Sequence, residues 1–280
     1  MDIFDRLITR IAKPVPLRTQ VIRKVLRHWP LGSYPARLDA GAVLRPHYGF
    51  CMYYAAQEAK ALGFKAMTAI ELGVAGGNGI LCMCQHREEI RRTLGIEIHL
   101  QGFDSGAGLP TTDDPRDVRY YWPPGSFEMD REALEKRLAG RAEIIFGDVA
   151  DTVSVWRGRP DAPLGAILFD LDLYTSTTAA LGLLTKQNLL PRVWCYFDDI
   201  IGYPENAFAD GTGEREAIRQ FNLAPERKLL QDHLSPARVF KARVPEAWHP
   251  QIYLYHRLSH PDYNTCLVGE SKLQLRLNSA

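Results

Sequence analysis

Between residues 66 and 197, short apolar runs alternate with stretches in which apolar residues recur at helical spacing. The apolar runs occupy residues 66–72, 96–103, 142–146, 166–169 and 193–197. The helical stretches occupy residues 78–86, 131–138 (after the candidate cap Asp130), 175–186 and 214–221. Strands that alternate with helices are typical of a parallel sheet with crossover helices. Two later strand-like segments, 228–233 and 251–258, are expected to pair as a hairpin at one edge. The pattern predicts an α/β, doubly wound, mostly parallel sheet of seven strands.

Helical periodicity also marks the amino-terminal part of the chain. It covers residues 3–11, 21–26 and 48–62, and Gly63 follows at the position where a left-handed residue commonly ends a helix. We therefore expect an N-terminal helical extension over residues 1–63 and one domain over residues 64–280. Within that domain, residues 106–129 place four prolines around Tyr120, Tyr121 and Trp122. This segment is expected to be a lid-like insertion.

Charge and cysteine content exclude several classes of function. The 280 residues carry 34 Lys and Arg against 33 Asp and Glu, a net charge of +1, so no overall field favours nucleic acid. The first 30 residues hold seven basic and two acidic side chains, which suits an anionic surface, a subunit contact or a solvated face. The five cysteines form no C-x-x-C pair. With no apolar span or secretion signal, we expect a cytoplasmic protein with reduced thiols.

Glycine gathers where the strand at 66–72 meets the following helix. The segment reads Glu71-Leu72-Gly73-Val74-Ala75-Gly76-Gly77-Asn78-Gly79. Glycines let the backbone approach a ligand closely and leave helix N–H groups directed at it, so the segment favours a nucleotide-type cradle over a plain turn. The dinucleotide spacing G-x-G-x-x-G is not met, because residue 75 is alanine. NAD is therefore disfavoured.

Acidic residues follow the next two strands. Asp104 ends the strand at 96–103, where its carboxylate could accept from both hydroxyls of a ribose or begin a turn. Asp148, after Gly147, could accept from an adenine amine or cap a helix. Because Glu71, Asp104 and Asp148 come together at one sheet edge, the set favours an adenosine-type site.

Two further strand ends carry four carboxylates. Asp170 and Asp172 follow the strand at 166–169, and Asp198 and Asp199 follow the strand at 193–197. Carboxylates this close repel one another unless protons or a cation are shared, and all-oxygen ligands favour Mg²⁺, Mn²⁺ or Ca²⁺. The alternative is that some of them only end strands or cap helices, as Asp172 could cap the helix at 175.

Together these motifs resemble class I S-adenosylmethionine-dependent methyltransferases, and in particular the TylF-like (macrocin O-methyltransferase) sugar O-methyltransferases. The resemblance covers about residues 66–222 and rests on the glycine segment, on Gly102-Phe103-Asp104-Ser105-x-x-Gly108-Leu109-Pro110, on Asp170-x-Asp172-x-Tyr174-x-Ser176-Thr177 and on Asp198-Asp199. It implies Asp170, Asp198 and Asp199 as Mg²⁺ ligands and Asp172 as catalytic base. It implies contacts to S-adenosylmethionine from the following residues: Glu71, Gly73, Gly76, Gly77, Asp104, Ser105, Asp148 and Asp170.

The resulting expectation is a Mg²⁺-dependent O-methyltransferase that acts on a hydroxyl of a sugar or another small natural product. Three alternatives remain open: a catechol or phenol acceptor, a module that binds S-adenosylmethionine or a nucleotide without turnover, and a weakly favoured oxidoreductase. Partners are expected to be a small hydroxylated substrate and further copies of the chain in a homo-oligomer, with neither nucleic acid nor a membrane span. Tyr120, Tyr121 and Trp122 are expected either to cover the acceptor or to hold the loop in place.

Overall fold

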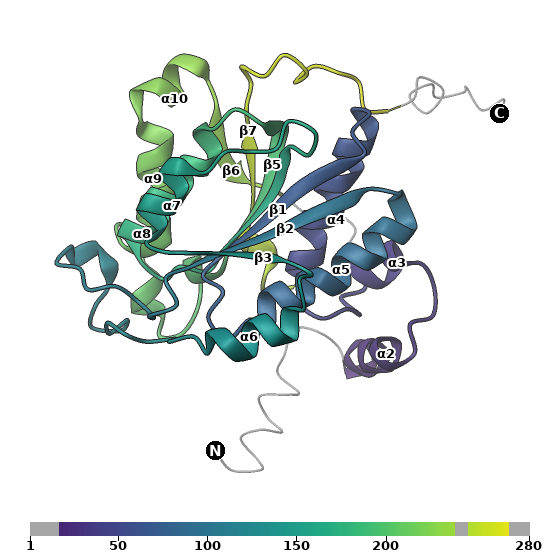
Figure 1. Cartoon of the computed structure of the whole chain (residues 1–280), viewed down its shortest axis with the longest axis horizontal. Coiled ribbons are helices and arrows are strands. Elements are labelled where there is room, and N and C mark those ends of the chain that lie inside the picture. Colours follow the sequence, from purple (N-terminus) through teal and green to yellow (C-terminus); the bar gives the residue numbers. More distant parts are fainter. Residues whose placement is uncertain (1–16, 239–245, 269–280) are drawn as a thin grey trace, which may run out of the picture.

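A seven-stranded sheet forms the centre of the computed structural model, which describes residues 17–238 and 246–268 (Figure 1). Its strands follow the order β3-β2-β1-β4-β5-β7-β6. They are β1 (Ala66–Leu72), β2 (Glu97–Asp104), β3 (Glu143–Phe146), β4 (Leu164–Phe169), β5 (Leu189–Phe197), β6 (His233–Pro236) and β7 (Ile252–His256). The first five pair in parallel, and β7 runs antiparallel to both β5 and β6. The predicted doubly wound, mostly parallel sheet is confirmed.

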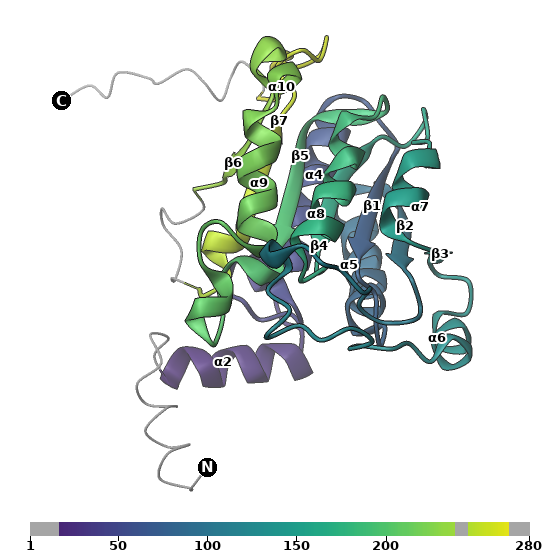
Figure 2. The same ribbon diagram turned by 90° about the vertical axis from the view of Figure 1, so that its left-hand side faces the viewer.

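Helices cover both faces of this sheet. They are α2 (Leu17–His28), α3 (Tyr34–Asp39), α4 (Pro46–Ala61), α5 (Asn78–Leu94), α6 (Arg131–Leu138), α7 (Val149–Val155), α8 (Tyr174–Ala180), α9 (Gly213–Leu223) and α10 (Pro225–Leu230). Side chains of α3, α4, α5 and α6 join one buried apolar cluster, and those of α7, α8 and α9 join another. Figure 2 shows α2 below the rest of the molecule. The helix predicted at residues 3–11 lies outside the described residues.

The central strands are buried on both faces, as expected for a parallel sheet between two helical layers. All six residues of β4 are buried, and β1 is buried from Met67 to Leu72. Helix α4 packs on β4 and β5 and is itself buried over most of its length, so it forms part of the core. The division of the chain into an N-terminal extension and a domain at residue 63 stays a prediction.

The strand predicted at residues 228–233 is wrong. Residues 225–230 form α10, in which Pro225 takes the first turn, where a missing N–H costs nothing. Leu229 and Leu230, the apolar pair that suggested a strand, are exposed. The chain becomes extended only at His233, and β6 then pairs antiparallel with β7 at the sheet edge. The predicted hairpin is therefore present, with its first strand shifted along the sequence.

All five cysteines are free thiols, as expected. Within residues 17–238 and 246–268, no helix has the length and the apolar character that crossing a bilayer requires. A cytoplasmic location stays a prediction.

Candidate active site

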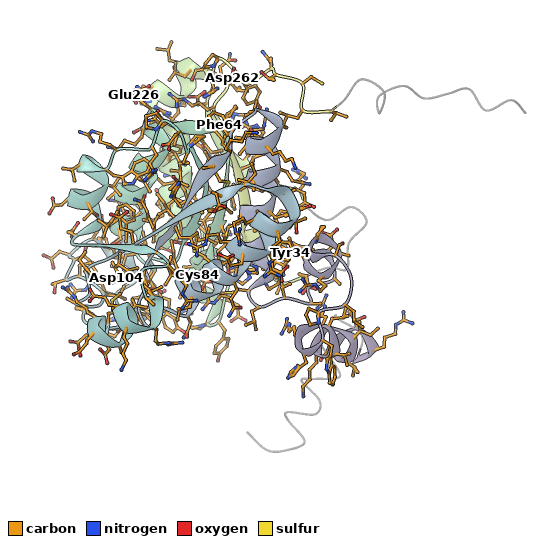
Figure 3. All side chains as sticks on the ribbon, turned by 45° about the vertical axis from the view of Figure 1, so that its right-hand side comes forward. Tyr34, Phe64, Cys84, Asp104, Glu226 and Asp262 are labelled. Carbon is orange, nitrogen blue, oxygen red and sulfur yellow. The ribbon has the colours of Figure 1, made fainter. Side chains whose placement is uncertain are left out.

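A cavity of about 350 Å³ opens at the carboxyl ends of the parallel strands. Between β1 and β4 the strand order reverses, and ligands of open α/β sheets bind outside the strand ends at such a point. The cavity is lined by the glycine segment after β1 and by the residues that follow β2, β3, β4 and β5. Figure 3 labels Asp104, one of these residues. The structure thus brings together all five strand ends that carry the predicted motifs.

The glycine segment turns sharply between β1 and α5. Gly73 has a φ of +82°, and a Cβ there would lie 1.8 Å from the carbonyl oxygen of Asp170. A Cβ on Gly76 would meet no heavy atom within 4 Å, so the backbone at this residue faces open space in the cavity. Gly77 precedes α5 and packs against Leu134 instead of lining the cavity. Two of the three predicted glycine contacts therefore face the cavity.

Gly73→Ala is expected to destabilise the fold by about 2–5 kcal/mol, because it combines a left-handed backbone with a backbone clash. Gly76→Ala is the matched control, since its methyl group enters open space. Urea unfolding of both variants measures the difference. Equal free energies of unfolding would contradict the geometry described for Gly73.

Glu71 is almost completely buried behind the glycine segment, with 1% of its surface exposed. Its Oε1 accepts a hydrogen bond of 2.9 Å from the Tyr48 hydroxyl, and its Oε2 has no hydrogen-bond partner among the described residues. A Cβ on Gly79 would lie 1.6 Å from Oε1, so the carboxylate needs glycine at the start of α5. Burial and the nearby Asp170 raise the pKa of Glu71 to about 8. The unpartnered oxygen is an acceptor that a ligand could use.

The side chains after β2 and β3 line the cavity, and they also hold backbone groups. Asp104 Oδ2 accepts from the N–H groups of Val74 and Ala75 at 2.9 and 2.8 Å, and its Oδ1 accepts from Gly106. Ser105 Oγ donates to the Gly108 carbonyl, and Asp148 caps α7 through the N–H of Ala150. Turn and cap roles are thus present at Asp104 and Asp148. Since a carboxylate offers about four lone-pair positions, each keeps capacity for a ligand.

The predicted metal ligands lie together. Asp170, Asp198 and Asp199 each offer a carboxylate oxygen, and the three atoms lie within 4.8 Å of one another. Mg²⁺ binds oxygen at 2.0–2.1 Å and Ca²⁺ at 2.3–2.6 Å, so two opposite ligand atoms are about 4–5 Å apart. The spacing and the chemistry of these donors fit a hard divalent cation.

Asp172 lies beside this group on the turn between β4 and α8. It is 8% exposed, and its φ of 61° is unusual for a residue other than glycine. Its N–H donates to Asp199 Oδ2 at 3.1 Å. The alternative that Asp172 caps the helix at 175 is wrong, because Asp117 Oδ1 accepts from the Thr175 N–H at 2.8 Å. Its carboxylate is therefore not used as a helix cap.

Four residues near the site were not found from the sequence. Buried Glu214 of α9 accepts from the N–H of Asp199 at 2.9 Å, and the Tyr196 hydroxyl donates to Asp198 Oδ1. Asp117 belongs to the insertion and reaches α8. Among the described residues that line the cavity, Arg45 is the only one with a cationic side chain. Of these four residues, only Glu214 had a sequence signal, because it is an acidic residue at the start of the helix predicted at 214–221.

Burial and mutual repulsion disfavour the charged forms of these acids. Burial, Asp198 and Asp172 raise the pKa of Asp170 to about 8, and burial and Asp198 raise that of Asp172 to about 7. Burial and neighbouring carboxylates hold the pKa values of Asp199 and Glu214 well above their usual range. Such shifts are common at functional sites, and a bound cation would relieve the repulsion.

The free energy of unfolding is expected to fall as pH rises from about 5 to about 8 in a chelating buffer. Asp170 and Asp172 keep their protons to about pH 8 and 7 in the fold, whereas in the unfolded chain they lose them near 3.8. Because the folded state binds more protons over this interval, raising the pH favours unfolding. Thermal melts with EDTA and with Mg²⁺ test this, with the larger Mg²⁺ stabilisation expected at pH 8. A stability independent of pH and Mg²⁺ would contradict it.

Residues 106–129, the segment predicted to be an insertion, form one wall of the cavity. Trp122 and Phe127 line it, together with Gly108, Leu109 and Pro110. The hydroxyls of Tyr120 and Tyr121 donate to the carbonyls of Asn206 and Tyr203, at 2.9 and 2.8 Å. Of the three aromatic residues singled out from the sequence, Trp122 lines the cavity, and Tyr120 and Tyr121 bind the loop after β5.

No protein-family model and no curated protein matches the sequence. Among solved structures, the O-methyltransferase NovP is similar over 86% of this chain and 98% of its own, with a TM-score of 0.52 and 14% identity. The calicheamicin methyltransferase CalS11 matches over 85% and 91%, with a TM-score of 0.47 and 17% identity. TomG from Streptomyces achromogenes, an O-methyltransferase in complex with SAM, matches over 90% and 94%, with a TM-score of 0.40 and 13% identity. The match to NovP shows that this chain shares the Rossmann-like fold of that protein.

Proposed function

We propose that the protein is an S-adenosylmethionine-dependent O-methyltransferase that uses a divalent cation. The observation that carries the proposal is one cavity with two halves. One half is a glycine segment with open space at Gly76, and the other is a group of carboxylates at Asp170, Asp198 and Asp199 beside buried Asp172. A cofactor cradle and a polar reaction site thus share one space at the switch point of the sheet. The fold shared with NovP supports this assignment.

The residues of the first half suit the parts of S-adenosylmethionine. Asp104 and Asp148 have acceptor capacity for the ribose hydroxyls and the adenine amine, and Gly76 leaves room for close approach. The unpartnered Glu71 Oε2 can accept from the amino group of the methionine part. Arg45, the only cationic side chain among the described residues that line the cavity, would bind the carboxylate of that part. Acids and arginine together match the zwitterionic end of the cofactor.

The second half suits the reaction. Asp170, Asp198 and Asp199 would hold Mg²⁺ or a similar ion, which would lower the pKa of an acceptor hydroxyl bound to it. Asp172 would accept the proton of that hydroxyl as the oxygen attacks the methyl carbon. The hydrogen bond from the Asp172 N–H to Asp199 fixes the backbone at this carboxylate. Trp122 and Phe127 would exclude water and pack on the acceptor.

We infer that the acceptor is a sugar or another small natural product with neighbouring hydroxyls, because two adjacent oxygens can share one cation. A catechol offers the same pair of oxygens and remains the alternative. Turnover of a panel of sugars and catechols separates them. The expected homo-oligomer stays a prediction that the mass in solution tests.

Calorimetric titration of the full chain with S-adenosylhomocysteine tests the cofactor assignment. One molecule is expected to bind per chain with no heat from NAD. Arg45→Gln is expected to weaken binding about tenfold or more, because a hydrogen bond to a charged group contributes about 1.5–3 kcal/mol. Arg91→Gln, on the exposed side of α5, is the control and should bind normally. Absence of binding by the unaltered chain would overturn the proposed function.

A further inference from the structure

A second concave site lies between α2, α3 and α5, apart from the residues of the catalytic cavity. This basic cleft has a volume of about 430 Å³. Figure 3 labels Tyr34 and Cys84, two of its lining residues. Five arginines from separate parts of the chain line it: Arg27 of α2, Arg37 of α3, Arg87 and Arg92 of α5, and Arg141 before β3.

Carboxylates balance only part of this positive charge. Glu88 and Glu89 are the acidic residues of the lining, and each is shared between arginines. Glu89 lies 3.1 Å from Arg37 and 3.9 Å from Arg92. Glu88 lies 3.3 Å from Arg87 and 3.1 Å from Arg91, which is outside the cleft. Five arginines against two carboxylates leave an excess of three positive charges in the lining.

Arg27 and Arg141 carry much of the excess charge. Arg27 donates to the Gly41 carbonyl at 3.0 Å, and Arg141 donates to the carbonyls of Leu138 and Arg137 at 3.0 and 2.6 Å. Within residues 17–238 and 246–268, neither forms an ion pair. Their carbonyl partners fix the guanidinium groups in position without neutralising them, which prepares them for an external anion.

Arg37 gives an independent sign of a missing partner. Its side chain is 11% exposed, and its buried Nε has no hydrogen-bond acceptor within residues 17–238 and 246–268, although another nitrogen pairs with Glu89. A buried N–H without an acceptor is costly, and in folded proteins such groups are nearly always satisfied. An oxygen-rich ligand would supply the acceptor that the described part of the chain does not provide.

We propose that the basic cleft binds a small molecule that carries a diphosphate group. Guanidinium groups match phosphate oxygens with paired hydrogen bonds, and three excess charges suit a diphosphate better than a single carboxylate. The volume leaves room for the group that the diphosphate carries, and the lining there is in part apolar, through Ala42, Val43 and Leu44. The catalytic cavity, which is lined by acids, offers no comparable surface to this anion.

Titration of the full chain with pyrophosphate at low ionic strength tests the cleft directly. One molecule is expected to bind per chain, more tightly than inorganic phosphate, and with unchanged affinity when S-adenosylhomocysteine saturates the other cavity. Arg27→Gln and Arg141→Gln should each weaken binding about tenfold or more. Arg157→Gln is the matched control, because this exposed arginine also donates to backbone carbonyls but lies outside the cleft, and it should bind normally.

Because Arg141 donates to the last carbonyls of α6, Arg141→Gln could disturb this helix. Thermal melts of the other variants keep the test decisive in that case. Pyrophosphate should raise the melting temperature of the unaltered chain and of Arg157→Gln, and should raise that of Arg27→Gln much less. Absence of saturable binding, or an equal loss in Arg157→Gln, would overturn the proposal. Because S-adenosylhomocysteine is titrated separately, failure here leaves the proposed methyl transfer untouched.

Discussion

Asp172→Asn is expected to slow methyl transfer by about 10²–10⁴-fold, the usual contribution of a positioned general base. Asparagine keeps the size of the side chain and the hydrogen bond from the backbone N–H to Asp199. It cannot take up the proton of the acceptor hydroxyl. Affinity for S-adenosylhomocysteine should be almost unchanged, since the substitution lies on the reaction side of the cavity. Single-turnover rates with a tritiated methyl donor measure the first effect, and calorimetry measures the second.

The control for this experiment is Asp151→Asn, which removes an exposed carboxylate of α7. It should leave the rate unchanged. A normal rate in Asp172→Asn would show that another group, or water, removes the proton. A lost affinity for S-adenosylhomocysteine would assign Asp172 to cofactor binding instead.

Removal of divalent cations with EDTA is expected to reduce the rate by about 10²-fold or more, because a cation at the acceptor oxygen contributes several kcal/mol to stabilising the developing charge. Mg²⁺ or Mn²⁺ should restore it. In Asp170→Asn, the Mg²⁺ concentration that restores half of the activity should rise. The substitution neutralises one of the three carboxylates whose oxygens lie within 4.8 Å of one another.

Binding of S-adenosylhomocysteine in EDTA separates this effect from a general loss of structure, and it should persist. Undiminished turnover in EDTA would mean that the carboxylates act without a cation. In that case their raised pKa values would point to shared protons at the site.

Much of the site could be predicted because its residues follow strands directly. In a parallel sheet the carboxyl ends of the strands share one edge, so Glu71, Asp104 and Asp170 had to lie near one another once the strands were recognised. Asp130 was recognised as a cap by its type and place, and its side chain does accept from the Ala133 N–H.

The residues that were missed depend on contacts between distant parts of the chain. Glu214 supports Asp199 from 15 residues later in the chain, and Asp117 reaches Thr175 from 58 residues away. Local periodicity carries no information about such pairs. The wrong strand at 228–233 has a local cause, since two adjacent leucines outweighed the helix signal of Pro225.

The three backbone hydrogen bonds of Asp104 have a consequence for how a cofactor would enter. Those from Val74 and Ala75 fasten the glycine segment to the end of β2. Much of the entropic cost of ordering this loop is thus met during folding and does not arise again when the cofactor binds. The segment should keep its shape through each catalytic cycle, and methyl donor and spent product should enter and leave a preorganised cradle.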